Sequence, residues 1–269
     1  MRTVLTIDGS DSSGGTGIQA DLKAFSANGV FGMSVVTVVT AQNTRGVSAV
    51  QHIDADMIAK QIASIFDDIE VDAVKIGMVA CSETIRIIAY SLKQYDACNL
   101  VVDPVLVSKS GYQLLNPDAI AALTACLLPV TTVVVANIAE AQEMAGRIII
   151  NLKDMEEAAR RIHCLGPRFV LLKGGRWEND VTGILFDGQT CQYLSEQRFP
   201  AKHTQRAGST LSAAITANLA RGYAVHEAVY RAREYIAAAF EPSWAVGKAI
   251  SPTHHFHTLY QKAGVFTNE

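Results

Sequence analysis

The polar residues best suited to chemistry stand at the ends of short apolar segments. Six such segments are each followed directly by acidic, amide, lysine or glycine residues. These residues are Asp8-Gly9-Ser10-Asp11, Gln42-Asn43, Gly77-Met78, Asp103-Pro104, Asn137 and Lys173-Gly174-Gly175. If the segments are parallel strands, their carboxyl ends share one edge of a sheet, where open α/β sheets bind ligands. We therefore expect a ligand site at that edge.

A second stretch favours an anion as part of that ligand. Ala207-Gly208-Ser209 leads into an apolar segment, residues 210–222, with the spacing of a helix. The first turn of a helix offers unpaired backbone N–H groups and the positive end of the helix dipole. Two common phosphate-binding patterns, G-x-G-x-x-G and G-x-x-x-x-G-K-[ST], are absent from the sequence. An ordinary serine-capped helix is the alternative interpretation of the same residues.

The elements that must position these residues alternate along the chain. Apolar, β-branched patterns predict strands at 3–7, 34–40, 72–76, 99–103, 131–137 and 168–173. Helical patterns lie between them at 17–29, 54–69, from about 82, from 116 and at 151–165. This alternation predicts an α/β fold with a mostly parallel central sheet and helices on both faces.

The C-terminal part departs from that alternation. Residues 181–194, VTGILFD-GQT-CQYL, predict a small antiparallel hairpin at one edge of the sheet. Two helices, at 208–222 and about 225–240, complete the core. Since no internal repeat, low-complexity tract or long linker interrupts the pattern, we expect a single domain over residues 1–269.

Composition and charge exclude several kinds of partner. The formal net charge is -3 and no run of Lys or Arg stands out, so nucleic acid is not an expected ligand. Five cysteines are scattered singly, which is typical of reduced thiols in the cytoplasm. Asp8 interrupts the first apolar run, and no apolar stretch approaches the roughly 18 residues of a membrane span. We therefore expect a cytoplasmic protein that does not enter the membrane.

Motifs that cover nearly the whole chain carry a resemblance to one family. The most specific of them is IDGSDSSGGTGIQADLKAFSANGVFGMSVVTVVTAQNTRGV. The others are VDAVKIGMVA, LVVDPVLVSKSGYQLL, ANIAEAQEMAG, VLLKGG, TLSAAITANLARG and AVGKAISPTHHFH. Together they resemble the hydroxymethylpyrimidine and hydroxymethylpyrimidine-phosphate kinases of thiamine biosynthesis, which belong to the ribokinase-like superfamily.

The resemblance implies a three-layer ribokinase-like kinase domain, the cofactors ATP and Mg²⁺, and a homodimer. The implied reaction phosphorylates the hydroxymethyl group of the aminopyrimidine and then its monophosphate. The residues implied around the pyrimidine are Gly9, Asp21, Gln42, Met78 and Val105. Gln42 suits this role physically, because its amide can both donate to and accept from an aminopyrimidine edge.

The resemblance also assigns residues to the phosphates. Asp103 and Glu140 are implied near the metal, since carboxylates suit a hard cation. Asn137, Lys173 and Lys248 are implied near the nucleotide.

The chain departs from the family in the motif that carries catalysis. Where the family has Thr-His-Gly-Thr-Gly-Cys, this chain has TQRAGS at residues 204–209. Gly208 is retained, but Arg206 replaces a glycine and Ala207 replaces a threonine. Ser209 replaces the cysteine implied to take the proton from the attacking hydroxyl, and a serine hydroxyl is a poorer base. If the replaced glycine has a positive φ, arginine strains the loop.

Three interpretations of these departures stay open. The chain is a kinase with an altered centre and lowered activity, because phosphoryl transfer depends mainly on positioning and charge. Alternatively, it retains the pyrimidine pocket as a binding or regulatory protein. The third interpretation is a pyridoxine-type or pyridoxal-type kinase of the same fold.

Overall fold

One mixed sheet runs through the protein. The computed structural model describes residues 1–79, 81–105, 117–174, 181–195, 207–240, 246–249 and 252–265. Nine strands are paired within these residues, in the order β3-β2-β1-β4-β5-β6-β7-β8-β9. Their bounds are β1 (Thr3–Asp11), β2 (Phe31–Asn43), β3 (Gly46–His52), β4 (Ala73–Ile76), β5 (Leu100–Val102), β6 (Val133–Asn137), β7 (Phe169–Lys173), β8 (Val181–Phe186) and β9 (Cys191–Ser195).

The pairing is parallel from β2 to β7 and antiparallel at both edges. The parallel part and the β8–β9 hairpin confirm the sequence prediction. The pairing of β3 with β2 was not predicted, because all seven residues of β3 are exposed and give no pattern of burial.

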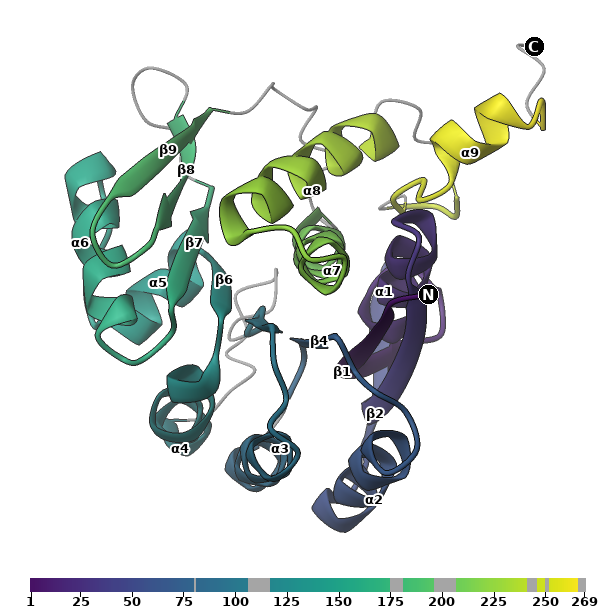
Figure 1. Cartoon of the computed structure of the whole chain (residues 1–269), viewed down its shortest axis with the longest axis horizontal. Coiled ribbons are helices and arrows are strands. Elements are labelled where there is room, and N and C mark those ends of the chain that lie inside the picture. Colours follow the sequence, from purple (N-terminus) through teal and green to yellow (C-terminus); the bar gives the residue numbers. More distant parts are fainter. Residues whose placement is uncertain are drawn as a thin grey trace.

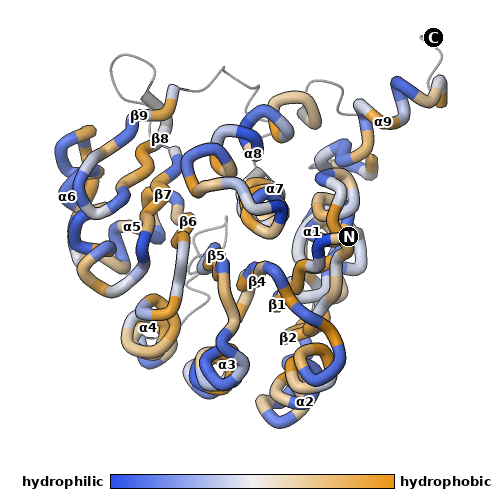
Figure 2. Tube along the Cα trace, in the orientation of Figure 1, coloured by the Kyte–Doolittle hydropathy of each residue, from blue (hydrophilic) through white to orange (hydrophobic). Residues whose placement is uncertain are grey.

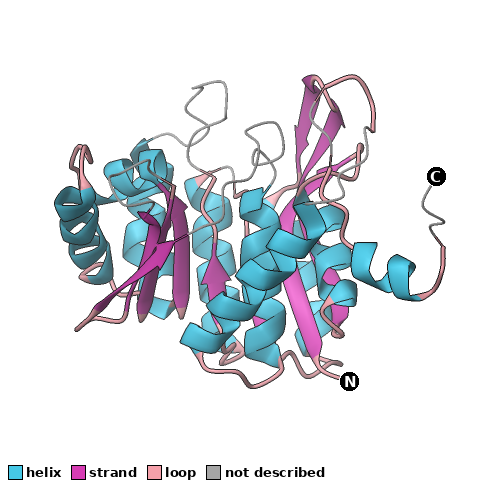
Figure 3. Cartoon of the chain, turned by 90° about the horizontal axis from the view of Figure 1, so that it is seen from above, coloured by secondary structure: helices cyan, strands magenta, loops and turns pink. Residues whose placement is uncertain are grey.

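Helices cover both faces of the sheet, as Figures 1 and 3 show. Helices α1 (Gly17–Ala27), α7 (Ala207–Ala220) and α8 (Val225–Phe240) lie on one face. The other face carries α2 (Ala55–Phe66), α3 (Ser82–Gln94), α4 (Pro117–Ala122), α5 (Ile138–Ala145) and α6 (Leu152–His163). A π-helical turn η1 (Leu123–Leu127) and a 3₁₀ turn η2 (Leu128–Val130) follow α4, and α9 (His257–Lys262) lies near the C-terminal end. The three layers agree with the predicted fold.

Alternation along the central strands builds a core on each face. Val133 and Val135 of β6 pack with the apolar residues of α7 and α8, whereas Val134 packs with the helices of the other face. All three residues are fully buried. Strands buried on both sides read as continuous apolar runs, which is why these segments were recognisable from sequence (Figure 2).

Helix α7 is buried along nearly its whole described length. Its small residues Ala213, Ala217 and Ala220 pack in one core with residues of α1. Small side chains let a helix approach its neighbours closely, so α7 carries its first turn close to the ends of the central strands.

Two further helix predictions can be compared with the structure. Asp54 caps α2 as predicted, since its carboxylate accepts a hydrogen bond from the Met57 N–H at 2.8 Å. Helix α5 was not predicted, although Asn137 and Glu140 form the capping box that begins it. The predicted cap at Asn116 lies outside the described residues, and α4 begins at Pro117.

None of the helices within the described ranges is both long and apolar enough to cross a membrane.

Candidate active site

A cleft of about 320 Å³ opens at the carboxyl ends of the parallel strands. It lies where the strand order reverses, since β2 and β4 flank β1 on opposite sides. Such switch points are where open α/β sheets bind ligands. The lining residues are Asp8, Gly9, Ser10, Asp11, Thr16, Gly17, Thr40, Gln42, Lys75, Gly77, Met78, Asp103, Val105, Asn137, Glu140, Lys173, Gly208 and Ser209.

Four of the five residues expected around a pyrimidine line this cleft: Gly9, Gln42, Met78 and Val105. Gly9 leaves no room for a side chain, because a Cβ there would lie 2.9 Å from Val38 Cγ1 and 3.5 Å from Met78 Sδ. The glycine therefore allows the backbone of β1 to form part of the cleft wall.

Hydrogen bonds hold Gln42 at the end of β2. Its backbone N–H donates to Ser12 Oγ at 2.8 Å. Thr40 Oγ1, which donates to the Ser10 carbonyl at 2.9 Å, also lies 3.3 Å from Gln42 Oε1. The Gln42 amide is thus held at the cleft wall, where it can form hydrogen bonds with a polar ring edge.

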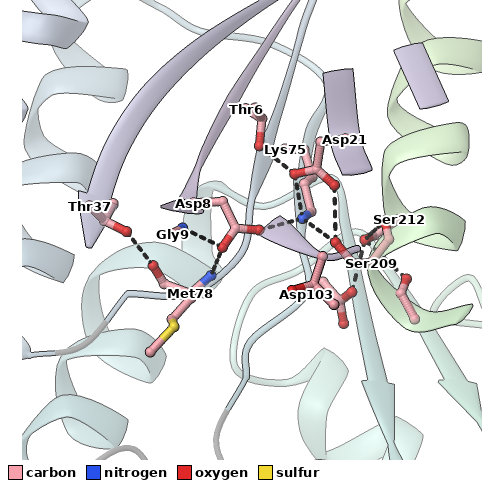
Figure 4. A network of polar contacts seen from close by, with 12 residues as sticks. Thr6, Asp8, Gly9, Asp21, Thr37, Lys75, Met78, Asp103, Ser209 and Ser212 are labelled. Carbon is pink, nitrogen blue, oxygen red and sulfur yellow. Dashed lines mark hydrogen bonds and ion pairs between the residues drawn. The ribbon is translucent and has the colours of Figure 1, made fainter. Parts of the chain in front are cut away.

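A buried ion triad, Asp8–Lys75–Asp21, lies at the base of the cleft (Figure 4). Lys75 Nζ lies 2.6 Å from Asp8 Oδ2 and 2.7 Å from Asp21 Oδ2, and the three side chains are 1%, 6% and 0% exposed. Asp8 Oδ1 accepts the backbone N–H groups of Gly9 at 2.6 Å and Met78 at 2.8 Å. The triad therefore positions two of the cleft-lining residues.

Burial and charge oppose each other within the triad. Burial disfavours the Lys75 ammonium, but Asp21 and Asp8 outweigh it and raise the pKa of Lys75 above its ordinary value. Burial raises the pKa of Asp21 to about 6, although Lys75 opposes this rise. Lys75 therefore keeps its proton, while Asp21 can gain one just below neutral pH.

Lys75 was not singled out as a functional residue in the sequence, whereas Asp8 was expected at the ligand-binding edge of the sheet. A signal was present, because Lys75 is the single charge inside the apolar strand AVKI. A lysine in a strand buried on both faces requires a buried carboxylate partner. The acidic residues Asp8 and Asp21 were the available candidates, but their pairing depends on the order of the strands.

A second polar cluster joins the first turn of α7 to β5 and β7. Lys173 Nζ donates to Asp103 Oδ1 at 3.0 Å, and the Ser212 hydroxyl donates to Asp103 Oδ2 at 2.8 Å. Burial disfavours the Asp103 carboxylate, but Lys173 and Lys75 outweigh it and lower the pKa of Asp103. A Cβ on Gly208 would lie 2.9 Å from Lys173 Nζ. Gly208 thus lets the lysine reach the N-terminal turn of the helix.

Glu140 and Asn137 line the cleft from the start of α5. Glu140 Oε2 accepts the Asn137 N–H at 2.8 Å, and Asn137 Oδ1 accepts the Glu140 N–H at 3.0 Å. Burial, together with the nearby Asp103 carboxylate, raises the pKa of Glu140 to about 7. A carboxyl group with this pKa gains from a cation placed beside it.

The glycine-rich loop after β1 is organised by Asp11. Its carboxylate accepts hydrogen bonds from the N–H groups of Ser13, Gly15 and Thr16 at 2.8 to 3.1 Å. Gly17 then begins α1 with a φ of 57°, and a Cβ there would meet the Gly9 carbonyl at 2.1 Å. The loop is therefore held against β1, and Thr16 and Gly17 face the cleft.

Four expected site residues lie elsewhere or are not described in full. Asp21 does not line the cleft but is buried beneath it. Lys248 is exposed and outside the cleft lining, and its backbone N–H donates to Thr44 Oγ1 at 3.2 Å. Arg206 lies outside the described residues, and Ala207 is the first residue of α7, with no side-chain description.

The described residues contain no group of three or more His, Cys, Asp or Glu side chains placed to hold a metal ion. Asp103 and Glu140 supply two carboxylates to the cleft. Mg²⁺ is commonly held by one or two carboxylates together with water and substrate phosphates. The donor set therefore fits a magnesium ion that arrives with a nucleotide, rather than one held by protein alone.

Comparison with known proteins agrees with this arrangement. Residues 11–254 match the sequence profile of the phosphomethylpyrimidine kinase family. The chain is 47% identical over 263 residues to the hydroxymethylpyrimidine/phosphomethylpyrimidine kinase of Rhizobium meliloti strain 1021, covering 96% of this chain and 98% of that protein.

Solved structures show the same likeness. The crystal structure of phosphomethylpyrimidine kinase from Clostridium difficile 630 has a TM-score of 0.82 and 46% identity, covering 90% of this chain and 100% of that one. An ADP complex of Bacillus subtilis pyridoxal kinase has a TM-score of 0.86 and 38% identity, covering 96% and 99%.

Proposed function

Since the chain belongs to the phosphomethylpyrimidine kinase family, we propose that it phosphorylates 4-amino-5-hydroxymethyl-2-methylpyrimidine and then its monophosphate. ATP is the phosphoryl donor, and the products serve thiamine biosynthesis. One observation supports this most strongly: a single cleft contains both Gln42 and Met78 and the cluster of Lys173, Gly208 and Ser209. A ring bound at the first group would present a hydroxymethyl group toward the second.

Recognition of the pyrimidine depends on Gln42, Gly9, Met78 and Val105 in this proposal. Gln42 forms hydrogen bonds with the polar edge of the ring. Met78 supplies a polarisable apolar contact to the ring face, and Gly9 gives the ring access to the backbone of β1. Asp21 is fully buried, so any contribution it makes to the substrate passes through its neighbours.

The nucleotide phosphates lie at the first turn of α7 in this proposal. The first N–H groups of a helix have no intrahelical partner, so those of Ala207, Gly208 and Ser209 favour a negatively charged group. Lys173 adds a positive charge beside Gly208, and Asn137 adds an amide at the start of α5. Lys248 would reach the nucleotide from outside the cleft.

A magnesium ion would be held by Asp103 and Glu140 together with the phosphates of ATP. Bound Mg²⁺ would neutralise charge on the phosphates. The protein itself keeps Asp103 ionised through Lys173, and it keeps Glu140 oriented through the capping box with Asn137. The ligands are thus held in place before the nucleotide arrives.

The altered motif at residues 204–209 is compatible with two functions, an active kinase or a pyrimidine-binding protein. In the first, the chain is an active kinase in which Ser209 and Arg206 stand where the family has cysteine and glycine. In the second, it binds the pyrimidine without transferring phosphate. Ser209 Oγ is held by hydrogen bonds to Asp21 and Lys75, so the serine is part of an organised site, and we favour the kinase. We also propose that the protein acts as a homodimer in the cytoplasm.

A direct assay tests the proposal. The purified protein is incubated with ATP, Mg²⁺ and one of three phosphoryl acceptors: hydroxymethylpyrimidine, its monophosphate or pyridoxal. Products are identified by mass spectrometry and ADP is quantified. The proposal expects phosphorylated pyrimidines at rates above that of pyridoxal phosphate. A faster reaction with pyridoxal would instead support the function named for the Bacillus subtilis neighbour. Sedimentation at micromolar concentration tests the dimer.

A further inference from the structure

The hydroxyl of Ser209 stands between the cleft and a carboxylate that the cleft does not reach. Ser209 lines the cleft, and its Oγ donates to Asp21 Oδ1 across 3.0 Å. Asp21 has no exposed surface and is not among the lining residues. Figure 4 shows the two side chains pointing toward each other, with Lys75 beside them. A proton that leaves the cleft can therefore reach Asp21 through the Ser209 hydroxyl.

The second oxygen of Asp21 is occupied by other donors. Thr6 Oγ1 donates to Asp21 Oδ2 at 2.6 Å, and Lys75 Nζ donates to it at 2.7 Å. Both donors are buried. Asp21 Oδ1 is consequently the oxygen that faces Ser209, and the carboxylate cannot rotate without breaking two buried hydrogen bonds.

Lys75 fixes the direction of the Ser209 hydroxyl. An ammonium group has three hydrogens, and Lys75 Nζ contacts Asp8, Asp21 and Ser209 Oγ, the last at 3.1 Å. A hydroxyl has one hydrogen and two lone pairs. The Ser209 hydroxyl donates its hydrogen to Asp21 and accepts a hydrogen bond from Lys75 with one lone pair, so one lone pair remains for the cleft. It therefore offers an acceptor, and not a donor, to a bound alcohol.

We propose that Ser209 and Asp21 form a proton relay in which Asp21, acting only through Ser209, receives the proton of the substrate hydroxyl. This inference rests on the proposed kinase function. As the substrate oxygen forms its bond to the γ-phosphorus of ATP, the bond from that phosphorus to the β–γ bridging oxygen breaks and ADP leaves. The substrate proton passes to Ser209 Oγ, and the Ser209 proton passes to Asp21 Oδ1. The products are the phosphate ester, ADP and a neutral Asp21, which returns its proton to water through Ser209 after release.

The charges around Asp21 suit this role. Lys75 of β4 contacts Asp21, and Asp8 of β1 pairs with the same lysine. Asp103 after β5 lies near Lys75, and Thr6 and Ser209 are neutral. Burial raises the pKa of Asp21 to about 6, so the carboxylate is ionised at pH 7 yet basic enough to hold a proton briefly. In the relay, Asp21 thus acts as the base, because the Ser209 hydroxyl alone is too weakly basic to hold the proton.

The first test compares Ser209→Ala with the wild type in the hydroxymethylpyrimidine kinase assay. The variant removes the hydroxyl but leaves the Lys75–Asp21 pair and the backbone of α7. We expect kcat to fall by about 10²-fold or more, because a positioned base contributes about 10²–10⁴-fold. KM for the pyrimidine should change little, since Gln42 is untouched. Ser91→Ala, a buried helical serine of α3, is the matched control and should retain the wild-type rate.

The second test uses the pH dependence of kcat. In the wild type, kcat should fall as pH drops through about 6, where Asp21 becomes protonated; we call this fall the acidic limb of the pH profile. Thr6→Val removes a hydrogen bond that lowers the pKa of Asp21, so this fall in kcat at acid pH should move to higher pH. Ser209→Ala should lose the limb, because the relay is broken. A residue with only a structural role would not move it.

The outcomes separate the relay from the function on which it rests. If Ser209→Ala keeps kcat within about twofold of the wild type, or keeps the acidic limb, the relay is wrong and the kinase proposal stands. If Thr6→Val folds and leaves the limb in place, Asp21 is not the proton acceptor. A wild type that makes no phosphorylated product overturns the relay and the proposed function together.

Discussion

Replacing Lys75 by methionine should strongly lower the free energy of unfolding. The loss caused by breaking an ion pair depends on how deeply the pair is buried more than on the distance between its charges. Lys75 lies 2.6 Å from Asp8 and 2.7 Å from Asp21, and no more than 6% of any of the three side chains is exposed. Methionine has a similar volume but removes the positive charge, so two buried carboxylates lose their shared partner. Breaking one buried pair in this way typically costs about 3–5 kcal/mol.

The chain offers a matched control for this prediction. Lys60 and Asp56 on α2 are also 2.6 Å apart, but their side chains are 67% and 76% exposed. Solvent screens such a pair, so Lys60→Met should leave the unfolding midpoint nearly unchanged. Urea unfolding followed by circular dichroism measures both variants at the same pH.

The destabilisation by Lys75→Met should depend on pH. The wild-type Lys75 has a raised pKa, so its stabilising contribution is present throughout the neutral range and is lost only at alkaline pH. In the variant, burial without the lysine raises the pKa of Asp21 further above about 6. The folded variant therefore binds more protons than the unfolded chain, and its stability should fall as pH rises from about 4 to beyond 6. Equal losses for Lys75→Met and Lys60→Met, or a loss that grows toward acid pH, would refute this reasoning.

Three further predictions concern the cleft. Gln42→Ala should weaken hydroxymethylpyrimidine binding by about 1–3 kcal/mol in calorimetry, the usual cost of an unpaired buried group. Substitution of the exposed Gln51 by alanine is the control and should leave the affinity unchanged. If Gln42→Ala binds the pyrimidine as tightly as the wild type, Gln42 is not part of the site. Gly208→Ala should lower ATP affinity more than pyrimidine affinity in separate titrations, because its Cβ would lie 2.9 Å from Lys173 Nζ; unchanged ATP binding would argue against phosphates there. Glu140→Gln should retain the capping box yet raise the Mg²⁺ concentration needed for half-maximal rate, and an unchanged requirement would remove Glu140 from the metal site.

The layout of the fold could be predicted because it depends on local patterns. Strands β4, β5 and β6 are buried on both faces and read as apolar runs, and the Asp54 cap marks the start of α2. Strand β3 could not be found in this way, since its pairing with β2 leaves every residue exposed. Helix α5 was recognisable, because Asn137 and Glu140 have the spacing of a capping box.

The site could be predicted in part, for a physical reason. Residues at strand ends converge in any parallel sheet, so Gln42, Met78 and Lys173 line one cleft as their positions in sequence indicated. The ion triad of Asp8, Lys75 and Asp21 depends on which strands become neighbours, and sequence spacing does not determine that. The contact of Ser209 with Asp21 joins residues 188 positions apart. Long-range contacts of this kind appear only when the order of the sheet is known.

We propose that this cleft transfers phosphate to a bound pyrimidine alcohol despite serine at position 209. To test this, the wild-type protein is incubated with hydroxymethylpyrimidine, ATP and Mg²⁺, and the phosphorylated products are followed by ³¹P NMR. Calorimetry on the same protein sample measures the affinity for hydroxymethylpyrimidine. We expect a phosphate monoester that is later converted to a diphosphate, with one ADP formed per phosphate transferred. Tight binding of the pyrimidine with no phosphate ester and no ADP above the rate without substrate would contradict it, and would identify a binding protein instead.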